Sequence, residues 1–342
     1  MSINRQWLLA KRPQGMLSLD DFVYNETAIP IADLAAGDLL LRNLWFSFDP
    51  AQRGWMDDRA SYLPPVALGE PMRATAVAQV VASANEQFPE GSLVQGLFDW
   101  QDYTRVSADN PMQPHPIPTG TPPNYPLSIF GATSLTAYFG ILDVGKIKAG
   151  DTVVVSGAAG AVGSVAAQIA RIKGCRVIGI AGGIEKCEWL INECKLDAAI
   201  NYKAENIDQQ LTLLCPDGVD VFFDNVGGNT LEVLLEHMSD HGRIVSCGQI
   251  SQYNAEQPNA GPSNLNRITE RRLRLEGFIL MDFIERIEEA MNDIAPWVMG
   301  GELAFREDVQ EGFENIPATL LRLFSGQNAG KQLLKISDPT EV

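Results

Sequence analysis

The sequence has few of the residues that build metal centres or disulfide frameworks. Histidine occurs three times in 342 residues, at His115, His237 and His241. His237 and His241 are four residues apart and would share one face of a helix, but a zinc site needs a third protein ligand, and no Cys or carboxylate constellation accompanies them. The five cysteines are odd in number, scattered and mostly set in apolar segments. We therefore expect neither a bound metal nor a disulfide framework.

Positive charge and long hydrophobic runs are also in short supply. Lys and Arg total 26 against 43 Asp and Glu, which gives a net charge of −17. Nucleic acids and anionic membranes attract basic surfaces, so neither is an expected partner. No stretch approaches the ~20 apolar residues of a membrane span, and the opening segment MSINRQWLLAKRP has no long apolar core. The sequence predicts a soluble, cytoplasmic protein.

The chain is long enough for two domains, since single cores rarely grow much beyond about 250 residues. Up to about residue 125, short β-like runs such as 38–42 and 75–81 are separated by turns that contain Pro and Gly, which predicts an irregular β-rich domain. The segment 110–126 then holds seven prolines, which cannot pair as central strands. We interpret it as an extended segment at a domain boundary.

Beyond this boundary, apolar strands alternate with helical periods, the pattern of a parallel sheet covered by helices. Residues 162, 165, 166, 169 and 170 are apolar and fall on one face of a helix after the first strand. The six predicted strands are 152–156, 176–181, 198–202, 219–226, 243–248 and 275–280. Six strands with intervening helices make a complete doubly wound sheet. After about residue 290 the elements become less regular, and 330–336 is predicted as a last strand.

A glycine loop lies between the first strand and the first helix of this region. The segment VVVSGAAGAVGSVAAQIA contains Gly157, Gly160 and Gly163. A pyrophosphate must approach backbone N–H groups closely at a helix N-terminus, and a Cβ in the way would block it. The spacing here is Gly-x-x-Gly-x-x-Gly, and Ala158 stands where the commoner dinucleotide-binding motif has its first glycine. The motif alone is therefore only moderately specific. The alternative is a turn of small residues that lets the helix and strand pack closely.

The end of the second strand distinguishes NADH from NADPH. An NAD site has an Asp or Glu there, which binds the ribose 2′-OH. Here residues 181–183 read Ala-Gly-Gly, and Lys186 follows, whose ammonium can meet a 2′-phosphate. We therefore predict NADPH, although Glu185 complicates the assignment. The alternative for Lys186 is a solvated residue at a helix start.

Several separated motifs resemble one family. The segments SGAAGAVG, GGIEKCEWL, NYK, DNVGG and HGRIVSCGQISQYN resemble the prostaglandin reductase and alkenal double-bond reductase family, within the zinc-independent medium-chain dehydrogenases/reductases. The likeness includes LLRNLWFSFDPAQRGWM, SYLPPVALGEPMRA, FGATSLTAYFGI and NAGKQLLKI. It covers nearly the whole chain, so it is far more specific than the glycine loop alone.

The resemblance implies a Rossmann domain inserted in a β-rich, GroES-like catalytic domain that both chain ends form. We accordingly predict a catalytic domain of residues 1–126 and 291–342 and an NADPH-binding domain of residues 127–290. The implied activity is NADPH-dependent reduction of the carbon–carbon double bond in small α,β-unsaturated aldehydes or ketones. The resemblance also suggests a homodimer, which would cover an apolar sheet edge at the late strand 275–280.

The resemblance also assigns site residues. Lys186 and Tyr202 would hold the adenosine 2′-phosphate, and Asn225 with Cys247 and Gly248 would line the cleft beside the ribose and pyrophosphate. Phe278 to Leu280 would flank the nicotinamide, and Asn328 would contact the cofactor from the returning tail. The predicted cofactor-binding set is Gly157, Ala158, Gly160, Ala161, Val162, Gly163, Gly182, Lys186, Tyr202, Asn225, Cys247, Gly248, Ile250, Tyr253, Phe278, Ile279, Leu280 and Asn328.

Tyr253 is the predicted catalytic residue, because it matches the family tyrosine near the substrate carbonyl. When hydride reaches the β-carbon of an enone, charge accumulates on the carbonyl oxygen, and a donor aimed at that oxygen lowers the barrier. The Tyr253 hydroxyl would donate there and help to pass a proton. The alternative is an ordinary loop tyrosine with a solvated hydroxyl. Cys247 has no partner His and is expected to be a small packing residue rather than a nucleophile.

One departure from the family concerns the substrate side. Relatives commonly carry Asp-Pro-Tyr where this chain has Asp49-Pro50-Ala51, which predicts a different or wider pocket and leaves the cofactor assignment intact. Three other functions stay open: a quinone reductase of the same superfamily, a non-catalytic NADPH-binding sensor and, as the weakest, a zinc alcohol dehydrogenase. The QISQYN segment favours the enone reductase over the quinone reductase.

Overall fold

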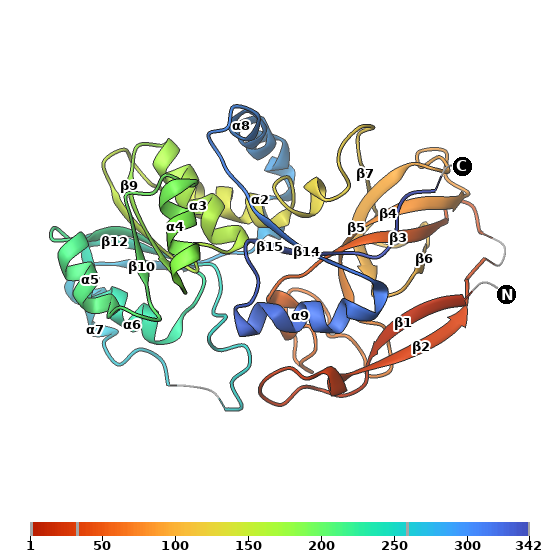
Figure 1. Ribbon diagram of the computed structural model, residues 1–342, viewed down its shortest axis with the longest axis horizontal. Coiled ribbons are helices and arrows are strands. Elements are labelled where there is room, and N and C mark those ends of the chain that lie inside the picture. The colour runs from red at the N-terminus through yellow and green to blue at the C-terminus, as the bar shows by residue number, and fades with distance from the viewer. Residues whose placement is uncertain (1–2, 32–33, 258–259, 341–342) are drawn as a thin grey trace. The chain divides into compact units, whose positions relative to one another are not determined.

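The computed structural model describes residues 3–31, 34–257 and 260–340, which form two compact units (Figure 1). Unit 1 comprises the described residues of Met1–Ser128, Glu307–Asn328 and Gln332–Val342, and unit 2 comprises those of Ile129–Arg306 and Ala329–Lys331. Helix α8 (Ile287–Met299), which spans the predicted boundary at 290/291, belongs to unit 2. The domain limits proposed from the sequence stay a prediction.

Unit 2 is built on a six-stranded parallel sheet in the order β10-β9-β8-β11-β12-β13. Its strands are β8 (Thr152–Ser156), β9 (Arg176–Ala181), β10 (Ala198–Asn201), β11 (Val219–Asp224), β12 (Met238–Ser246) and β13 (Arg274–Gly277). The strand order reverses between β8 and β11, as in doubly wound nucleotide-binding sheets. All six predicted strands are present. The last one ends earlier than predicted, because the 3₁₀ helix η4 (Leu280–Arg286) begins at Leu280.

Helices cover both faces of this sheet. On one face, α5 (Ile207–Leu214) packs against α6 (Gly228–His237), and α6 packs against α7 (Asn266–Glu270) (Figure 1). Leu211, Leu234 and Leu235 from these helices share a core with strand residues such as Phe222. The other face carries α3 (Ala161–Ile172) and α4 (Ile184–Asn192), with α2 (Ala132–Phe139) packed against α3 and α8. The predicted apolar face of α3 is buried, apart from a half-buried Val162.

Unit 1 is rich in antiparallel strands. Its main sheet has the order β14-β15-β3-β4-β5-β7, with β6 also paired to β3, and β1 and β2 form a separate hairpin. The strands are β1 (Ile3–Leu9), β2 (Phe22–Ala28), β3 (Leu39–Ser47), β4 (Arg73–Ser83), β5 (Leu93–Asp99), β6 (Tyr103–Val106), β7 (His115–Pro116), β14 (Glu307–Glu311) and β15 (Lys331–Lys335). In the proline-rich segment only the two residues of β7 form a strand, at the sheet edge, where a missing N–H is tolerated.

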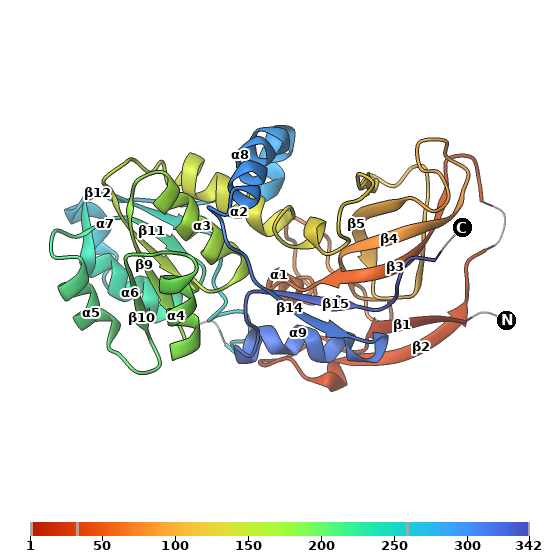
Figure 2. The same ribbon diagram turned by 45° about the horizontal axis from the view of Figure 1, so that its top comes forward.

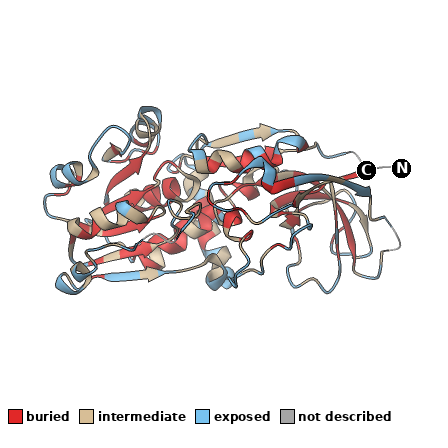
Figure 3. Ribbon diagram, turned by 90° about the horizontal axis from the view of Figure 1, so that it is seen from below, coloured by how far each residue is buried: buried red, intermediate tan, exposed pale blue. Residues whose placement is uncertain are grey.

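The late part of the chain completes unit 1. Strand β15 pairs with β3, and the helix α9 (Ile316–Ser325) lies beside this sheet (Figure 2). Ile316 and Leu320 of α9 are buried in the same core as Phe46. Buried residues concentrate along the strands and inner helix faces of each unit, as Figure 3 shows. The predicted fold class is therefore confirmed: a doubly wound parallel sheet with a β-rich domain to which both ends of the chain contribute.

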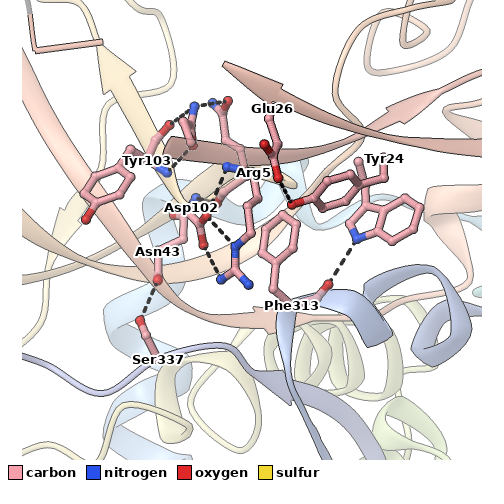
Figure 4. Close-up of polar contacts among 11 residues, drawn as sticks. Arg5, Tyr24, Glu26, Asn43, Asp102, Tyr103, Phe313 and Ser337 are labelled. Carbon is pink, nitrogen blue, oxygen red and sulfur yellow. Dashed lines mark hydrogen bonds and ion pairs between the residues drawn. The ribbon is translucent and has the colours of Figure 1, made fainter. Parts of the chain in front are cut away.

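Polar contacts attach the β1–β2 hairpin to the rest of unit 1 (Figure 4). The Arg5 guanidinium donates to both carboxylate oxygens of Asp102, at 2.8 and 2.9 Å, and the Trp7 indole donates to the carbonyl of Phe313 at 3.0 Å. The Arg5 guanidinium also lies 4.5 Å from the centre of the Phe313 ring. Residues from the first strand and from the last part of the chain are thus joined. Among all described residues, no helix has the length and apolar content to cross a membrane.

Candidate cofactor site

The glycine loop of unit 2 has the geometry of a phosphate cradle. Gly157 follows β8 with φ +59°, and Gly160 caps the N-terminus of α3. A Cβ on Gly163 would lie 2.3 Å from the carbonyl oxygen of Gly157, so only glycine fits there. The N–H groups of a first helical turn, here including Ala161 and Val162, have no partner within the helix, which suits an anion approaching the N-terminus of α3. The spacing of the glycines therefore reflects both close packing and a place for phosphate.

The ends of β9 and β10 form a second part of the site. A Cβ on Gly182 would lie 2.8 Å from the hydroxyl of Tyr202, so the half-exposed tyrosine ring rests directly against this glycine. The next residue, Gly183, has φ +105° and donates its N–H to Asn201 at 2.9 Å. Helix α4 starts here and carries Lys186 in its first turn. The structure thus brings Gly182 and Tyr202 together, near the start of the helix that bears Lys186.

The turn after β11 contacts the end of β8, the strand that precedes the glycine loop, and the turn after β12 contacts the turn after β11. Asn225, just after β11, donates its side-chain N–H to the carbonyl of Ser156 at 2.7 Å. The carbonyl of Asn225 accepts from Ile250 at 3.2 Å, which ties the turn after β12 to the turn after β11. Asn225, Gly248 and Ile250 are therefore brought to the same edge of the sheet as the glycine loop.

Tyr253 belongs to this same cluster. Its hydroxyl oxygen accepts a hydrogen bond from the backbone N–H of Gln249 at 3.1 Å, and a Cβ on Gly248 would lie 3.2 Å from it. A phenol that accepts one hydrogen bond can still donate another. The tyrosine is half-buried, and its hydroxyl is fixed beside Gly248. This arrangement differs from that of a loop tyrosine with only a solvated hydroxyl.

Cys247 lacks the environment of a reactive thiol. Its backbone N–H donates to the carbonyl of Asp224 at 2.9 Å. Burial, with a contribution from Asp224, raises the pKa of the Cys247 thiol to about 12, so almost none of it is thiolate at neutral pH. Its proximity to Gly248 supports a packing role.

Phe278, Ile279 and Leu280 connect β13 to η4. Phe278 packs on a glycine of the π-helical turn η3 (Gly140–Val144), where a Cβ on Gly140 would lie 2.5 Å from its ring. Phe278 is the first of three aromatic rings in contact. The ring centres of Phe278 and Phe283 are 6.2 Å apart, and Phe283 stacks on Phe139 with 4.7 Å between ring centres. Phe278 to Leu280 are half-buried. Their predicted contact with the nicotinamide stays a prediction.

The returning tail reaches the glycine loop at Gly330. Gly330 forms a parallel bridge with Gly160, and a Cβ on it would lie 2.1 Å from the carbonyl oxygen of Arg306. Asn328 lies two residues before this bridge, in the part of the chain assigned to unit 1. Its predicted contact with the cofactor is therefore not tested.

The histidine pair considered from the sequence is not on a helix face. Helix α6 ends at His237, whereas His241 lies within β12 with φ +61°, because its N–H pairs with the carbonyl of Arg271 at 2.7 Å. His237 instead contacts Asp208 at 2.7 Å. No group of three His, Cys, Asp or Glu side chains suited to a metal occurs in residues 3–31, 34–257 and 260–340. The expected absence of a metal stays a prediction.

Two site residues were missed in the sequence analysis. Ser156 and Asp224 are the last residues of β8 and β11, and the Ser156 hydroxyl donates to Asp224 at 2.8 Å. Both positions read as ordinary strand ends in the sequence. The signal that points to them is a polar residue at the carboxyl end of two apolar strands, since ligands of doubly wound sheets bind at that edge.

Similar proteins match this architecture over most of its length. Residues 5–113 match the model described as the N-terminal domain of oxidoreductase, and residues 161–295 match the one described as zinc-binding dehydrogenase. YfmJ of Bacillus subtilis, which is named as an NADP-dependent oxidoreductase, is 44% identical over 98% of this chain and 98% of its own. The NADPH-dependent curcumin reductase of Escherichia coli is 37% identical over 98% of this chain and 97% of its own.

A plant relative and a crystal structure agree with these matches. The NADP(+)-dependent 2-alkenal reductase of Nicotiana tabacum is 36% identical and covers 98% of both chains. The crystal structure of CurA from Vibrio vulnificus in complex with NADPH is 37% identical, with a TM-score of 0.92 over 98% of this chain and 100% of that one. The chain belongs to the medium-chain dehydrogenase/reductase family. The predicted family, its oxidoreductase activity and NADPH as cofactor are confirmed.

Proposed function

We propose that this oxidoreductase reduces the carbon–carbon double bond of α,β-unsaturated aldehydes or ketones. One observation carries the proposal: the hydroxyl of Tyr253 is fixed beside Gly248, at the same sheet edge as the glycine loop and Asn225. The names of the curcumin reductase and 2-alkenal reductase relatives support the same class of substrate. An ordinary dehydrogenase of alcohols would need a different polarising group, such as a zinc ion.

The residues present fit NADPH. The N-terminus of α3 suits the pyrophosphate, and the close packing of Gly163 against the backbone of Gly157 holds that helix against the glycine loop. We assign the adenosine 2′-phosphate to Lys186 and Tyr202, the cleft beside the ribose and pyrophosphate to Asn225, and the nicotinamide to the segment that begins at Phe278. When bound, NADPH supplies the hydride, and the protein positions and polarises the reactants.

Tyr253 provides the polarisation. Its hydroxyl donates to the carbonyl oxygen of the substrate, where negative charge appears as the β-carbon is reduced. The hydrogen bond from Gln249 holds the phenol oxygen in place and favours proton donation from it. The same phenol, directly or through water, then supplies a proton to the enolate.

The test is kcat/KM of Tyr253→Phe on a small enone, with an NADPH titration beside it. We expect a loss of about ten- to a thousandfold in rate, with NADPH affinity nearly intact. Tyr24→Phe is the matched control, since it removes a hydroxyl that bonds Glu26 in the hairpin of unit 1 and should change neither quantity. An unchanged rate for Tyr253→Phe would make this residue a pocket wall, and collapsed NADPH binding would make it a cofactor ligand; either result contradicts the proposal.

The alternative functions are tested by measuring NADPH oxidation with other acceptors. Faster turnover of quinones than of enones would indicate a quinone reductase, and no turnover on any acceptor would indicate a sensor.

We also propose that the protein is a homodimer. Strand β13 lies at the end of the parallel sheet as described, and its Leu275 is 43% exposed. An uncovered sheet edge with an apolar residue favours pairing with a second copy. Light scattering at micromolar concentration should return the mass of two chains, and a stable monomer would contradict the dimer.

A further inference from the structure

The junction of β8 and β11 contains a buried polar pair that the proposed chemistry does not use. Ser156 is completely buried and Asp224 is 2% exposed. They end two neighbouring parallel strands at the point where the strand order reverses. Polar groups with so little access to water are costly unless they are fully hydrogen-bonded, so their retention calls for a physical reason.

Asp224 organises two turns. Its Oδ1 accepts hydrogen bonds from the Ser156 hydroxyl at 2.8 Å and from the backbone N–H groups of Val226 and Gly227, each at 3.0 Å. Its backbone carbonyl accepts from Cys247 at 2.9 Å and Gly248 at 3.1 Å. Burial raises the pKa of this carboxyl, and the three donors oppose the shift. One residue therefore fixes both the turn after β11 and the turn after β12.

Ser156 orients Asn225. Its hydroxyl donates to Asp224 and accepts the backbone N–H of Asn225 at 2.9 Å, and its carbonyl accepts the Asn225 side-chain N–H at 2.7 Å. With its amide nitrogen directed at Ser156, Asn225 has its Oδ1 to offer a ligand. An amide oxygen is an acceptor, and ribose hydroxyls are donors that match it.

We propose that Ser156 and Asp224 are positioning residues for NADPH. They fix Asn225 so that its Oδ1 accepts a hydrogen bond from a ribose hydroxyl of the nicotinamide half, and they hold the two turns in that geometry before the cofactor binds. This inference rests on the assignment of Asn225 to the cofactor, not on the substrate or on Tyr253. Preorganisation of this kind strengthens binding because less ordering is left for the bound state.

The same strand supplies a matched control. Asp220 lies near the other end of β11, and its Oδ2 accepts the backbone N–H of Thr152 on β8 at 2.9 Å. Asp220 and Asp224 therefore each join β8 to β11, one at the amino ends and one at the carboxyl ends. A purely structural role for Asp224 predicts similar behaviour for the two aspartates.

The experiment measures NADPH affinity by fluorescence for Asp224→Asn, Ser156→Ala and Asp220→Asn, with thermal unfolding as a check. The probe 2′,5′-ADP, which lacks the nicotinamide half, is titrated in parallel. Asp224→Asn turns three hydrogen bonds to a carboxylate into weaker ones to a neutral amide, and Ser156→Ala deletes a hydroxyl. We expect Asp224→Asn to weaken NADPH about tenfold or more and Ser156→Ala to weaken it about fivefold. Both should leave 2′,5′-ADP within about twofold, and Asp220→Asn should leave both ligands within about twofold.

Three results would overturn the proposal. The first is unchanged NADPH binding in both Asp224→Asn and Ser156→Ala. The second is that these variants lose affinity for NADPH and for 2′,5′-ADP equally. The third is that Asp220→Asn loses as much NADPH affinity as Asp224→Asn. If Asp224→Asn does not fold, Ser156→Ala alone decides between these outcomes, since it deletes one hydroxyl. Binding is measured without substrate, so failure of Tyr253→Phe and failure of this inference are read separately.

Discussion

Two aspartates, the buried Asp224 of unit 2 and the half-buried Asp99 of unit 1, have very different surroundings. Asp224 in unit 2 collects three hydrogen bonds on one oxygen at the end of β11. Asp99 in unit 1 ends β5 opposite Arg73, and its side chain has a contact of 3.4 Å from Gln101. Burial raises the pKa of Asp99 to about 6, although Arg73 lowers it. Burial raises the pKa of both carboxyls, but three hydrogen-bond donors hold Asp224, whereas Asp99 has the charge of Arg73 and one long contact from Gln101.

The neighbours of Asp99 show the same contrast. Among the described residues, Gln52 Oε1, Trp55 Nε1 and Arg73 Nε are buried atoms with no hydrogen-bond partner. The Arg73 guanidinium lies 5.4 Å from the centre of the Trp55 ring, and Gln52 is in the short helix α1 (Ala51–Gly54) that begins with Ala51. The Ser156–Asp224 pair, on the predicted cofactor side, thus has several hydrogen-bond partners. The part of unit 1 near Ala51, which we predict to be the substrate side, leaves some buried donors and acceptors without a partner.

The largest effect that we expect on cofactor binding tests the cofactor side of this comparison. Lys186→Ala removes the charge assigned to the 2′-phosphate, and a charge-assisted contact is worth roughly 1.5–3 kcal/mol. We expect NADPH affinity to fall about ten- to a hundredfold, with NADH affinity nearly unchanged. The control is Lys195→Ala, just beyond the C-terminal end of α4, which should alter neither. Equal use of NADH and NADPH by the unaltered protein would refute the assignment of Lys186.

A second expectation concerns stability and compares the two carboxyls directly. Because the folded-state pKa of Asp99 is raised, its contribution is most favourable below about pH 4 and is lost as pH rises through about 6. Asp99→Asn removes this dependence, so the stability of the variant relative to the unaltered protein should rise between pH 4 and pH 7 by about 1–3 kcal/mol. Thermal unfolding across that range measures it. A difference that stays constant or shrinks with pH would show that Asp99 is adequately paired with Arg73.

The smallest expected effect lies on the substrate side. Ala51→Tyr restores the aromatic residue that relatives carry, and Ala51 is half-buried at the start of α1. We expect KM for small enones to change by about two- to tenfold, as one added contact of roughly 0.5–1.5 kcal/mol implies, with NADPH affinity unaltered. Steady-state kinetics on a short and a bulky enone measures the change. A shift in NADPH affinity instead would place Ala51 on the cofactor side.

The parts of the site that sequence could predict are those set by local rules. The glycine loop is visible because Gly163 has no room for a Cβ, and the strands of unit 2 are visible as apolar runs between helical periods. The pairing of Ser156 with Asp224 is not visible, because it joins residues 68 positions apart through the sheet. The helical reading of His237 and His241 failed for a similar reason, since pairing with Arg271 draws His241 into β12.

The pairing of β15 with β3 has a consequence for biosynthesis. Leu334 lies opposite Phe46, so the central sheet of unit 1 joins an early and a late part of the chain. All six strands of unit 2 leave the ribosome before β15, so its sheet can assemble while that of unit 1 still lacks β15. A nascent chain stalled before residue 331 should therefore show protease resistance in 129–306 and cleavage within the first 128 residues. Unit 2 would mature first, and the sheet of unit 1 would close last.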